Sequence, residues 1–239
     1  MLKDLAGKVV LITGASRGIG RAIAQTMAEA GCSLALMARS SEGLHDTQTL
    51  CESSGVQIVT IPVDITDSHQ VRSGLQRVVE QFGGIDILVN NAGIGRLSSV
   101  LGADPAEWAE LLNVNLVATM EVTRLTLPYI VRRNGGAIIF IASLSAKITY
   151  AGGAAYCASK HAIAGFAGAL FEDVRGFNIK VCSICPGYVN TELISSLNFD
   201  GASLIQPEDV AEAVRFVAQF PDTGCPTEIL IRCQKPPYM

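Results

Sequence analysis

Two residues of the sequence stand at a spacing that suits acid–base chemistry. Tyr156 and Lys160 are four positions apart in a stretch with helical periodicity, so their side chains share one face of the predicted helix. A tyrosine phenol has a pKa of about 10, which is too high for efficient proton transfer near neutrality, and a neighbouring ammonium lowers it. The pair predicts a lysine-assisted tyrosine acid/base. A surface coincidence is the alternative that the pair alone leaves open.

A glycine-rich turn follows the first predicted strand and opens the first predicted helix. It reads TGASRGIG over residues 13–20, with the glycines spaced G-x-x-x-G-x-G. Glycines allow a tight turn and a close approach of backbone to a pyrophosphate, and the helix N-terminus offers free N–H groups to phosphate. The turn predicts dinucleotide binding, with a purely structural turn as the alternative.

The end of the second predicted strand bears on which dinucleotide binds. NAD-binding proteins usually place an acidic residue here to hold the ribose 2′-hydroxyl. The stretch Leu36–Ser40 contains no acid; Arg39 stands in its place, and Arg17 lies inside the glycine-rich turn. Two guanidinium groups suit a 2′-phosphate. We expect NADP(H) rather than NAD(H), against the alternative of two solvated surface arginines.

The elements that must position these residues alternate along the chain. Short apolar runs alternate with longer helical stretches, which indicates a parallel sheet covered on both faces. No linker or repeat interrupts residues 1–239, so we expect one domain, with a loose tail at Gln234–Met239. The predicted strands are Lys8–Thr13, Ser33–Ala38, Val56–Pro62, Ile85–Val89, Ala137–Ala142, Lys180–Ile184 and Glu228–Ile231. The predicted helices are Ile19–Ala30, Ser41–Ser53, Asp67–Phe82, Asp104–Arg133, Ala154–Arg175 and Pro207–Phe220.

Composition narrows the class of protein. The chain has 239 residues, of which 49% are hydrophobic and 17% charged, and its net charge is −4. Such a chain builds a core rather than staying disordered, and its charge disfavours a nucleic-acid coat protein. No apolar run approaches the roughly 18 residues of a membrane span, and no targeting pattern opens the chain. We expect neither a nucleic-acid partner nor a membrane span.

The seven cysteines are scattered and odd in number. This predicts reduced thiols in a reducing compartment such as the cytoplasm. Cys182 and Cys185 lie on one predicted strand, where residues three apart point to opposite faces, so they cannot grip one ion. The three histidines show no ligand spacing, and we expect no metal.

Three ordered motifs together resemble the short-chain dehydrogenase/reductase family in its single-domain branch. They are TGASRGIG, the NNAG run at residues 90–93, and Tyr156-x-x-x-Lys160, and the resemblance spans about Lys8 to Arg232. It implies an α/β fold with a doubly wound, Rossmann-like sheet of seven parallel strands. It also implies that Tyr156 is the acid/base and that Lys160 assists it and holds the nicotinamide ribose.

The resemblance assigns two further catalytic positions. Ser143, 13 residues before Tyr156, corresponds to the serine that hydrogen-bonds the substrate carbonyl, with Ser145 as the nearby alternative. Asn115 corresponds to the helix asparagine that holds a water for a proton relay to lysine, with Asn113 as the competing choice.

The remaining resemblances concern the cofactor. Asp64 corresponds to the residue that meets the adenine ring, although a helix cap or a loop acid is its plain alternative. Asn90–Gly93 corresponds to the loop along the adenosine and ribose, and Pro186–Thr191 to the segment beside the nicotinamide. The full predicted NADP(H) set is Gly14, Ser16, Arg17, Gly18, Ile19, Gly20, Arg39, Asp64, Asn91, Ala92, Gly93, Tyr156, Lys160, Pro186, Gly187, Val189 and Thr191.

The implied activity is hydride transfer between the nicotinamide and a carbonyl or secondary alcohol. The chain ends in PTEILIRCQKPP rather than a VDGG-like segment, so a small-molecule carbonyl is favoured over a 3-oxoacyl thioester of fatty-acid type. The segment Tyr188–Gln206 is the expected lid, and its apolar Leu193, Ile194 and Phe199 suggest a modest, partly apolar substrate. Ile148 and Tyr150 are further candidates for the pocket lining. A non-catalytic NADPH-binding regulator is the second function class.

The helix that carries Tyr156 is rich in small residues, which let helices approach closely. They are Ala158, Ala162, Ala164, Gly165, Ala167, Gly168 and Ala169. Packing within the chain is one interpretation. The other is a helix–helix contact between copies, formed with the predicted Asp104–Arg133 helix, as the family resemblance implies. We expect a homodimer or a homotetramer.

Overall fold

The apolar runs form one parallel sheet. A computed structural model describes residues 2–197 and 199–235, and in those ranges the sheet has seven strands in the order β3-β2-β1-β4-β5-β6-β7. The predicted doubly wound fold is confirmed. The strands are β1 (Val9–Thr13), β2 (Ser33–Ala38), β3 (Ile58–Pro62), β4 (Ile87–Asn90), β5 (Gly136–Ile141), β6 (Ile179–Pro186) and β7 (Glu228–Ile231).

The strand order reverses between β1 and β4. These two strands pair directly, with Val10 opposite Ile87 and Ile12 opposite Val89, while the chain between them has visited β2 and β3 on the other side. Ligands of open α/β sheets bind beyond the carboxyl ends of the strands at such a switch point. The glycine-rich turn after β1 and the NNAG loop after β4 therefore emerge side by side.

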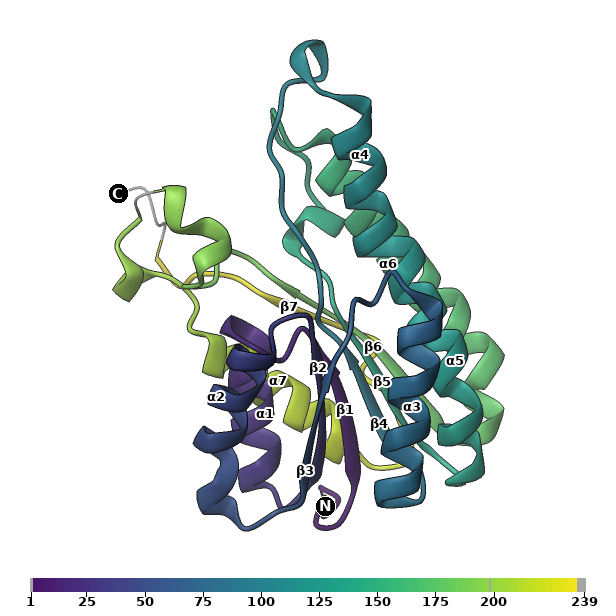
Figure 1. Ribbon diagram of the computed structural model, residues 1–239. Helices are drawn as coiled ribbons and strands as arrows, with labels where there is room; N and C mark the ends of the chain where they lie inside the picture. The colour runs from purple at the N-terminus through teal and green to yellow at the C-terminus, as the bar shows by residue number, and fades with distance from the viewer. Residues whose placement is uncertain (1, 198, 236–239) are drawn as a thin grey trace.

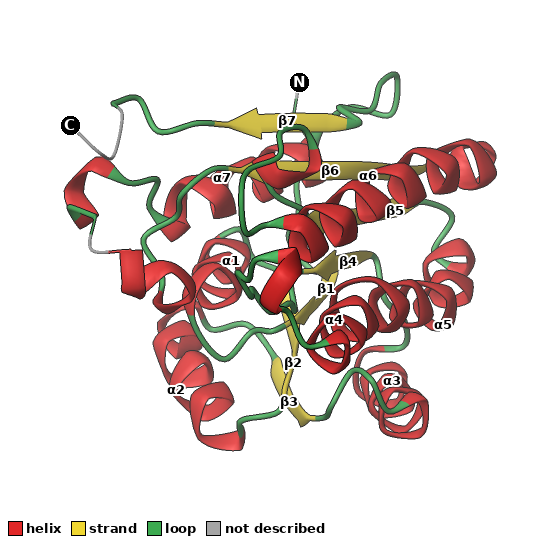
Figure 2. Cartoon of the chain, turned by 90° about the horizontal axis from the view of Figure 1, so that it is seen from above, coloured by secondary structure: helices red, strands yellow, loops and turns green. Residues whose placement is uncertain are grey.

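Helices cover both faces of the sheet. Figures 1 and 2 show α1, α2 and α7 on one face and α3, α4, α5 and α6 on the other. The described helices are α1 (Gly18–Glu29), α2 (Ser41–Cys51), α3 (Ser68–Phe82), α4 (Pro105–Leu112), α5 (Thr119–Arg132), α6 (Ala154–Val174) and α7 (Pro207–Gln219). Asp67 caps α3 by accepting hydrogen bonds from two backbone N–H groups of its first turn, which places the helix start one residue after the predicted one.

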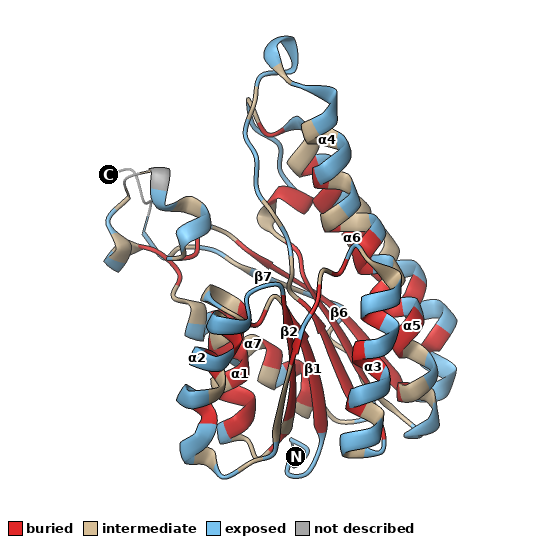
Figure 3. Cartoon of the chain, viewed as in Figure 1, coloured by how far each residue is buried: buried red, intermediate tan, exposed pale blue. Residues whose placement is uncertain are grey.

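Two apolar cores lie on the two faces of the sheet. Figure 3 shows the central strands buried between them, whereas the edge strands β3 and β7 are partly exposed. Alternate residues of the central strands pack into opposite cores. Cys182 belongs to the core under α1 and α7, and Cys185 to the core under α3, α5 and α6. Their opposite orientation was predicted from their spacing. All seven cysteines are free thiols.

The predicted helix over Asp104–Arg133 is interrupted. Between α4 and α5 the chain makes a π-helical segment, Asn113–Ala118, in which each backbone bond spans one residue more than in an α-helix. The periodicity of apolar residues gives no sign of this wide turn. It brings the side chain of Asn115 inward, while Asn113 stays exposed.

A buried carboxylate joins three elements at the amino end of the sheet. Asp86, just before β4, is 2% exposed and accepts hydrogen bonds from the Val9 backbone N–H, the Lys8 ammonium and the Arg133 guanidinium, at 2.9 to 3.2 Å. These partners hold the pKa of Asp86 below its ordinary value, although burial opposes the shift. We call this set the Asp86 cluster.

Two irregular segments rise from the carboxyl end of the sheet. Figure 1 shows the loop between β4 and α4 projecting beyond the sheet and the segment after β6, the expected lid, on the opposite side of the carboxyl edge. The last four residues of the predicted tail lie outside the described residues. Among the described helices, none has the length and apolar character needed to cross a membrane.

Candidate active site

The glycine-rich turn is packed too tightly for any side chain at two of its glycines. Gly14 has φ +66°, and a Cβ there would lie 2.9 Å from the Ala92 backbone. A Cβ on Gly20 would lie 2.2 Å from the Gly14 carbonyl oxygen. These contacts press α1 against the end of β1 and leave no room for a side chain at Gly14 or Gly20, so the backbone of this cradle stays accessible.

A small hydrogen-bond network ties this turn to the NNAG loop. The Thr13 hydroxyl accepts from the backbone N–H groups of Asn91 and Ala92, at 3.0 and 3.1 Å. The Asn91 side-chain amide donates back to the carbonyls of Thr13 and Gly14. Asn90 turns the other way and donates to Thr123 on α5. Both walls of the cleft at the switch point are thereby fixed to each other.

The N-terminus of α1 fits a phosphate group. Its N-cap residue, Arg17, makes no side-chain cap, and the first turn carries no acid, so the free N–H groups and the helix dipole face the cleft. The Ser16 carbonyl is held by the Arg21 guanidinium, and Ile19 packs partly against the core. The cradle therefore suits the dinucleotide that the sequence predicts.

The two predicted arginines lie at the open side of the cleft. Arg39 is exposed at the end of β2, and the Arg17 guanidinium pairs with the Glu192 carboxylate of the lid. Asp64 is a loop acid rather than a helix cap. It accepts from the Thr66 N–H and hydroxyl at 2.9 and 2.7 Å, and these bonds, with a smaller effect of Arg39, keep its pKa below the ordinary value.

Tyr156 and Lys160 lie together on α6. Lys160 is 8% exposed, and its ammonium donates to the Ile141 carbonyl at the end of β5 at 3.0 Å and lies 5.7 Å from the centre of the Tyr156 ring. The shared face predicted from their spacing is confirmed.

The expected lowering of the tyrosine pKa is wrong for the protein alone. Burial raises the pKa of Tyr156 to about 12, although the Ser143 side chain opposes the rise. Burial also lowers the pKa of Lys160 to about 8. The reason is desolvation: both groups sit where their charged forms lose water, and the ammonium is directed at a carbonyl rather than at the phenol. The pair is thus a protonated phenol beside an ammonium that readily loses its proton.

Asn115 reaches the same site from the π-helical segment. Its amide oxygen accepts from the Ile94 N–H at 2.8 Å, and its amide nitrogen donates to the Ile94 carbonyl at 2.9 Å and to the Ser159 hydroxyl at 3.3 Å. A Cβ placed on Gly93 would lie 3.2 Å from the Asn115 Oδ1 and 3.9 Å from the Lys160 Nζ. Asn115 and Lys160 therefore face one small space beside Gly93.

Ser143 follows β5, and its side chain acts to lower the pKa of the Tyr156 phenol. Its Oγ accepts from the Ser145 backbone N–H at 3.1 Å and lies 3.1 Å from the Ser145 Oγ. Ser145 is buried behind it and reaches the Tyr150 hydroxyl at 3.3 Å.

The segment after β6 carries the predicted nicotinamide residues. Val189 forms a parallel bridge with Ile205, and this bridge uses the Asn190 N–H and the Tyr188 carbonyl. The N–H and carbonyl of Val189 itself therefore point away from Ile205, and the carbonyl accepts from the Thr191 hydroxyl at 3.3 Å. Gly187 donates its N–H to Ile231 on β7, which anchors the segment to the sheet edge.

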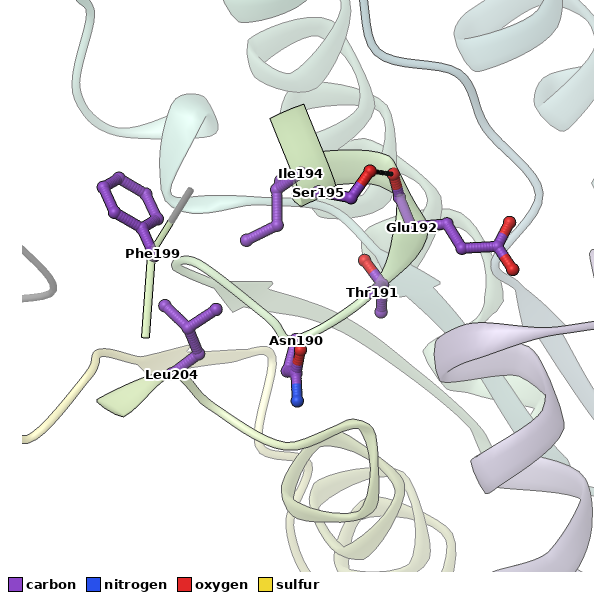
Figure 4. A pocket seen from close by; sticks show the side chains of 7 residues that line it. All are labelled: Asn190, Thr191, Glu192, Ile194, Ser195, Phe199 and Leu204. Carbon is purple, nitrogen blue, oxygen red and sulfur yellow. Dashed lines mark hydrogen bonds between the residues drawn. The ribbon is translucent and has the colours of Figure 1, made fainter. Parts of the chain in front are cut away.

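The lid encloses a shallow pocket of about 310 Å³, shown in Figure 4. Apolar Ile194, Phe199 and Leu204 lie across from polar Asn190 and Thr191 in that view. The pocket does not include the Tyr156 site. Around that site, large apolar side chains are exposed on three separate segments. They are Leu97 on the loop before α4, Ile148 and Tyr150 on the loop before α6, and Tyr188 and Leu193 at the lid.

The family model of the short chain dehydrogenases matches residues 8–200 of this chain. The chain therefore belongs to the short-chain dehydrogenase family, and it is an oxidoreductase by that membership. Among similar proteins, the ketoacyl reductase HetN of Nostoc sp. is 35% identical over 89% of this chain and 76% of its own length. The 3-oxoacyl-[acyl-carrier-protein] reductase FabG of Vibrio cholerae is 32% identical over 90% of this chain and 91% of its own length.

Solved structures agree with the fold. A short-chain type dehydrogenase/reductase from Mycobacterium marinum superposes with a TM-score of 0.90 at 30% identity, covering 96% of this chain and 95% of that one. A 7 alpha-hydroxysteroid dehydrogenase, complexed with NADH and 7-oxo glycochenodeoxycholic acid, gives 0.89 at 26% identity over 95% and 93%.

Three residues of the site were not singled out from the sequence. They are Thr13, Ser159 and Glu192. Thr13 immediately precedes Gly14, and its place at the end of a buried strand was the available signal. Ser159 donates to the Tyr156 carbonyl at 2.7 Å, and its side chain faces Asn115, which only the fold reveals. The Glu192 contact with Arg17 joins positions 175 residues apart and left no trace in the sequence.

Proposed function

We propose that this protein is an NADP(H)-dependent reductase of ketones or aldehydes, acting reversibly on the corresponding alcohols. The observation that carries the proposal is the buried Lys160 beside Tyr156, with Ser143 against the phenol and Asn115 behind the ammonium, next to a backbone cradle. NADP(H), when bound along that cradle, supplies or receives the hydride. All four side chains are present, and a protein that only senses the cofactor needs no such set.

The chain's own residues account for the proton and for the charge. The Ser143 and Tyr156 hydroxyls donate to the carbonyl oxygen, where negative charge develops in reduction. With a pKa of about 12 the phenol is protonated at neutral pH, so it is a proton donor toward a developing alkoxide. Lys160, with a pKa of about 8, is positioned to return a proton to the Tyr156 phenolate. Asn115, on the far side of Lys160, would hold a water that resupplies the proton to the Lys160 amine.

The preference for the phosphorylated cofactor rests on charge. Arg39 and Arg17 are the cations at the open side of the cradle, and Leu36–Ser40 offers no carboxylate to a ribose 2′-hydroxyl. Arg39→Asp should shift the ratio of kcat/KM for NADPH over NADH by about tenfold to a hundredfold toward NADH, since one charge-assisted bond is lost and one repulsion is gained. An unchanged ratio would remove this part of the proposal.

The substrate class is a modest, partly apolar carbonyl compound. The exposed apolar side chains around the Tyr156 site support this, because such groups are otherwise left in water. A second candidate is a 3-oxoacyl thioester, because two similar proteins, HetN and FabG, carry ketoacyl reductase names. The ending PTEILIRCQKPP favours the first candidate.

One assay addresses the activity and both substrate classes. It follows oxidation of NADPH against small ketones, aromatic diketones, β-keto esters and acyl thioesters, and the reverse reaction with β-hydroxy amino acids. Tyr156→Phe is the control, and NADPH binding followed by fluorescence tests whether this variant still binds the cofactor. Turnover that depends on Tyr156 supports the reductase, and the best substrate selects the class. Turnover that survives Tyr156→Phe would exclude the assigned role, and tight NADPH binding without any turnover would favour the regulator.

We also propose that the protein acts as a homodimer or homotetramer, in a reducing compartment. One face of α6 is open: a Cβ on Gly165 or Gly168 would meet nothing within 4 Å. Exposed Val117 and Met120 belong to the neighbouring helical segment. Ala167, by contrast, packs inside the chain's own core. Gly168→Arg should convert the oligomer to a monomer in light scattering, and a wild-type monomer would contradict the proposal.

A further inference from the structure

Three hydroxyl groups form a line from the candidate catalytic serine to the surface. The Ser143 Oγ lies 3.1 Å from the Ser145 Oγ, which in turn lies 3.3 Å from the Tyr150 Oη. We call this line the hydroxyl chain. Ser145 is buried, whereas Tyr150 is 43% exposed, so the hydroxyl chain runs from a desolvated interior to water.

The loop that carries Tyr150 is held in place. A Cβ on Gly153 would lie 2.4 Å from the Tyr150 ring, so the ring rests directly on that glycine. The neighbouring Gly152 carbonyl accepts from the Ser98 N–H at 2.9 Å, which joins this loop to the one before α4. Tyr150 is therefore a fixed end of the hydroxyl chain rather than a freely rotating side chain.

The number of protons that each hydroxyl can donate gives the hydroxyl chain a direction. A hydroxyl has one proton to donate and two lone pairs. In the structure the Ser143 hydroxyl donates to Ser145 while it accepts from the Ser145 backbone N–H. In that arrangement Ser143 has no proton left for a substrate carbonyl. To donate to that oxygen, Ser143 must turn its proton outward and accept from the Ser145 hydroxyl instead, which then needs a donor of its own.

The geometry points to Tyr150 as that donor. We propose that Tyr150 and Ser145 are positioning residues, which turn the Ser143 hydroxyl toward the reacting oxygen. In the reversed chain Tyr150 donates to Ser145, Ser145 donates to Ser143, and Ser143 donates to the carbonyl oxygen, with no covalent bond made or broken. Each bond polarises the next, so the Ser143 proton becomes a stronger donor as negative charge grows on that oxygen. The inference rests on the proposed function.

A double-mutant cycle tests the coupling. With a ketone that gives Tyr156-dependent turnover, Ser143→Ala should lower kcat about a hundredfold, because it removes one donor to the developing oxyanion. Tyr150→Phe should lower kcat about threefold to tenfold with little change in KM, since the bond it supports strengthens in the transition state. In the Ser143→Ala background, Tyr150→Phe should have no further effect.

Controls separate positioning from packing. Ser145→Ala should resemble Tyr150→Phe, and Ser145→Thr, which keeps the hydroxyl, should restore kcat. Tyr129→Phe is the matched control. It removes the hydroxyl of a tyrosine on α5 whose ring packs against the core and lies 5.6 Å from the Arg132 guanidinium, and kcat should not change. Thermal melting and NADPH binding by fluorescence should be unchanged in every variant.

The outcomes are distinct. If Tyr150→Phe costs the same factor with Ser143 present and absent, Tyr150 acts on the substrate directly or through packing, and the inference is overturned. If Tyr150→Phe has no effect on kcat, the inference is also overturned. If instead the Tyr156→Phe variant keeps the turnover of the wild type, the proposed function itself fails. The hydroxyl chain then loses its role as well.

Discussion

The two ends of the sheet differ in how fully hydrogen-bond partners compensate a buried charge. At the amino end, the carboxylate of Asp86 accepts four hydrogen bonds, from one backbone N–H and two cationic side chains. At the carboxyl end, the ammonium of Lys160 has three protons to donate and, among the described residues, one protein acceptor. The first charge is almost fully compensated, and the second is not. The same fold therefore stabilises itself at one end and keeps a reactive, costly group at the other.

The pKa directions express this difference. The pKa of Asp86 is lowered, so its charged form is favoured by folding, whereas burial lowers the pKa of Lys160 to about 8, so its charged form is disfavoured. The comparison predicts that substitutions at the amino end change stability and leave turnover intact. Substitutions at the carboxyl end should do the reverse.

The largest expected effect is on turnover at the carboxyl end. Tyr156→Phe should lower kcat about a thousandfold or more, because no other group is positioned to deliver the proton. Its melting temperature should stay within a few degrees of the wild-type value, since the ring and its packing remain. Steady-state kinetics and a thermal melt on one preparation check both halves. A large loss of stability would break the division between the two ends.

The second effect is on stability at the amino end. Asp86→Asn should lower the free energy of unfolding by about 2 to 3 kcal/mol, because the charge-assisted bonds to Arg133 and Lys8 are lost. The loss stays this small because the Lys8 and Arg133 side chains are partly exposed and are hydrated when Asp86 no longer pairs with them. Urea denaturation measures it, and kcat should match the wild type. A fall in kcat at unchanged fold would show that the two ends are coupled.

A smaller effect of opposite sign is expected from Lys160→Met. The variant should be inactive yet more stable than the wild type by about 1 to 2 kcal/mol at neutral pH, since a desolvated ammonium is replaced by an apolar side chain of similar length. Losing the bond to the Ile141 carbonyl offsets part of the gain. Urea denaturation at neutral pH is the measurement. A destabilised Lys160→Met would mean that the ammonium is compensated after all.

The smallest effect is in the pH dependence of stability. The Lys160 pKa is about 8 in the folded chain against an ordinary 10.5, so between these values the unfolded chain binds more protons and this group's contribution to stability rises with pH. The difference in stability between Lys160→Met and the wild type should therefore shrink over that range, while the effects of buried thiols and phenols cancel in the subtraction.

Asp86 has a lowered pKa, so its contribution to stability is lost as pH falls through the acidic range. Asp86→Asn should lose less stability on acidification than the wild type.

Much of the fold was predictable because it follows from local patterns. Apolar runs marked the strands, and they are most continuous in the central strands, since strands buried on both faces need no polar alternation. The glycines of the turn and the Tyr156–Lys160 spacing marked the site, because both act over a few neighbouring positions. The opposite orientation of Cys182 and Cys185 followed from the strand period alone.

The rest depends on contacts between distant residues. The Asp86 cluster joins residues from three places in the chain, and nothing beside Asp86 in the sequence reveals its partners. The raised pKa of Tyr156 was missed because desolvation depends on what surrounds the phenol, while the sequence shows only the lysine one turn away. The hydroxyl chain needed the path of the loop from Ser143 to Gly153, which no periodicity predicts.

The π-helical segment at Asn113–Ala118 has a consequence for how this gene can vary. Such a wide turn is equivalent to one extra residue inserted into a helix, and it shifts the phase of everything on one side by about 100° relative to the other. Removing one residue there before Asn115 would restore a regular helix, keep every hydrogen-bonded turn satisfied, and still rotate Asn115 away from Lys160. A single-codon deletion in the middle of this helix should therefore be tolerated by folding and rejected by function, which is the reverse of what deletions inside helices usually do.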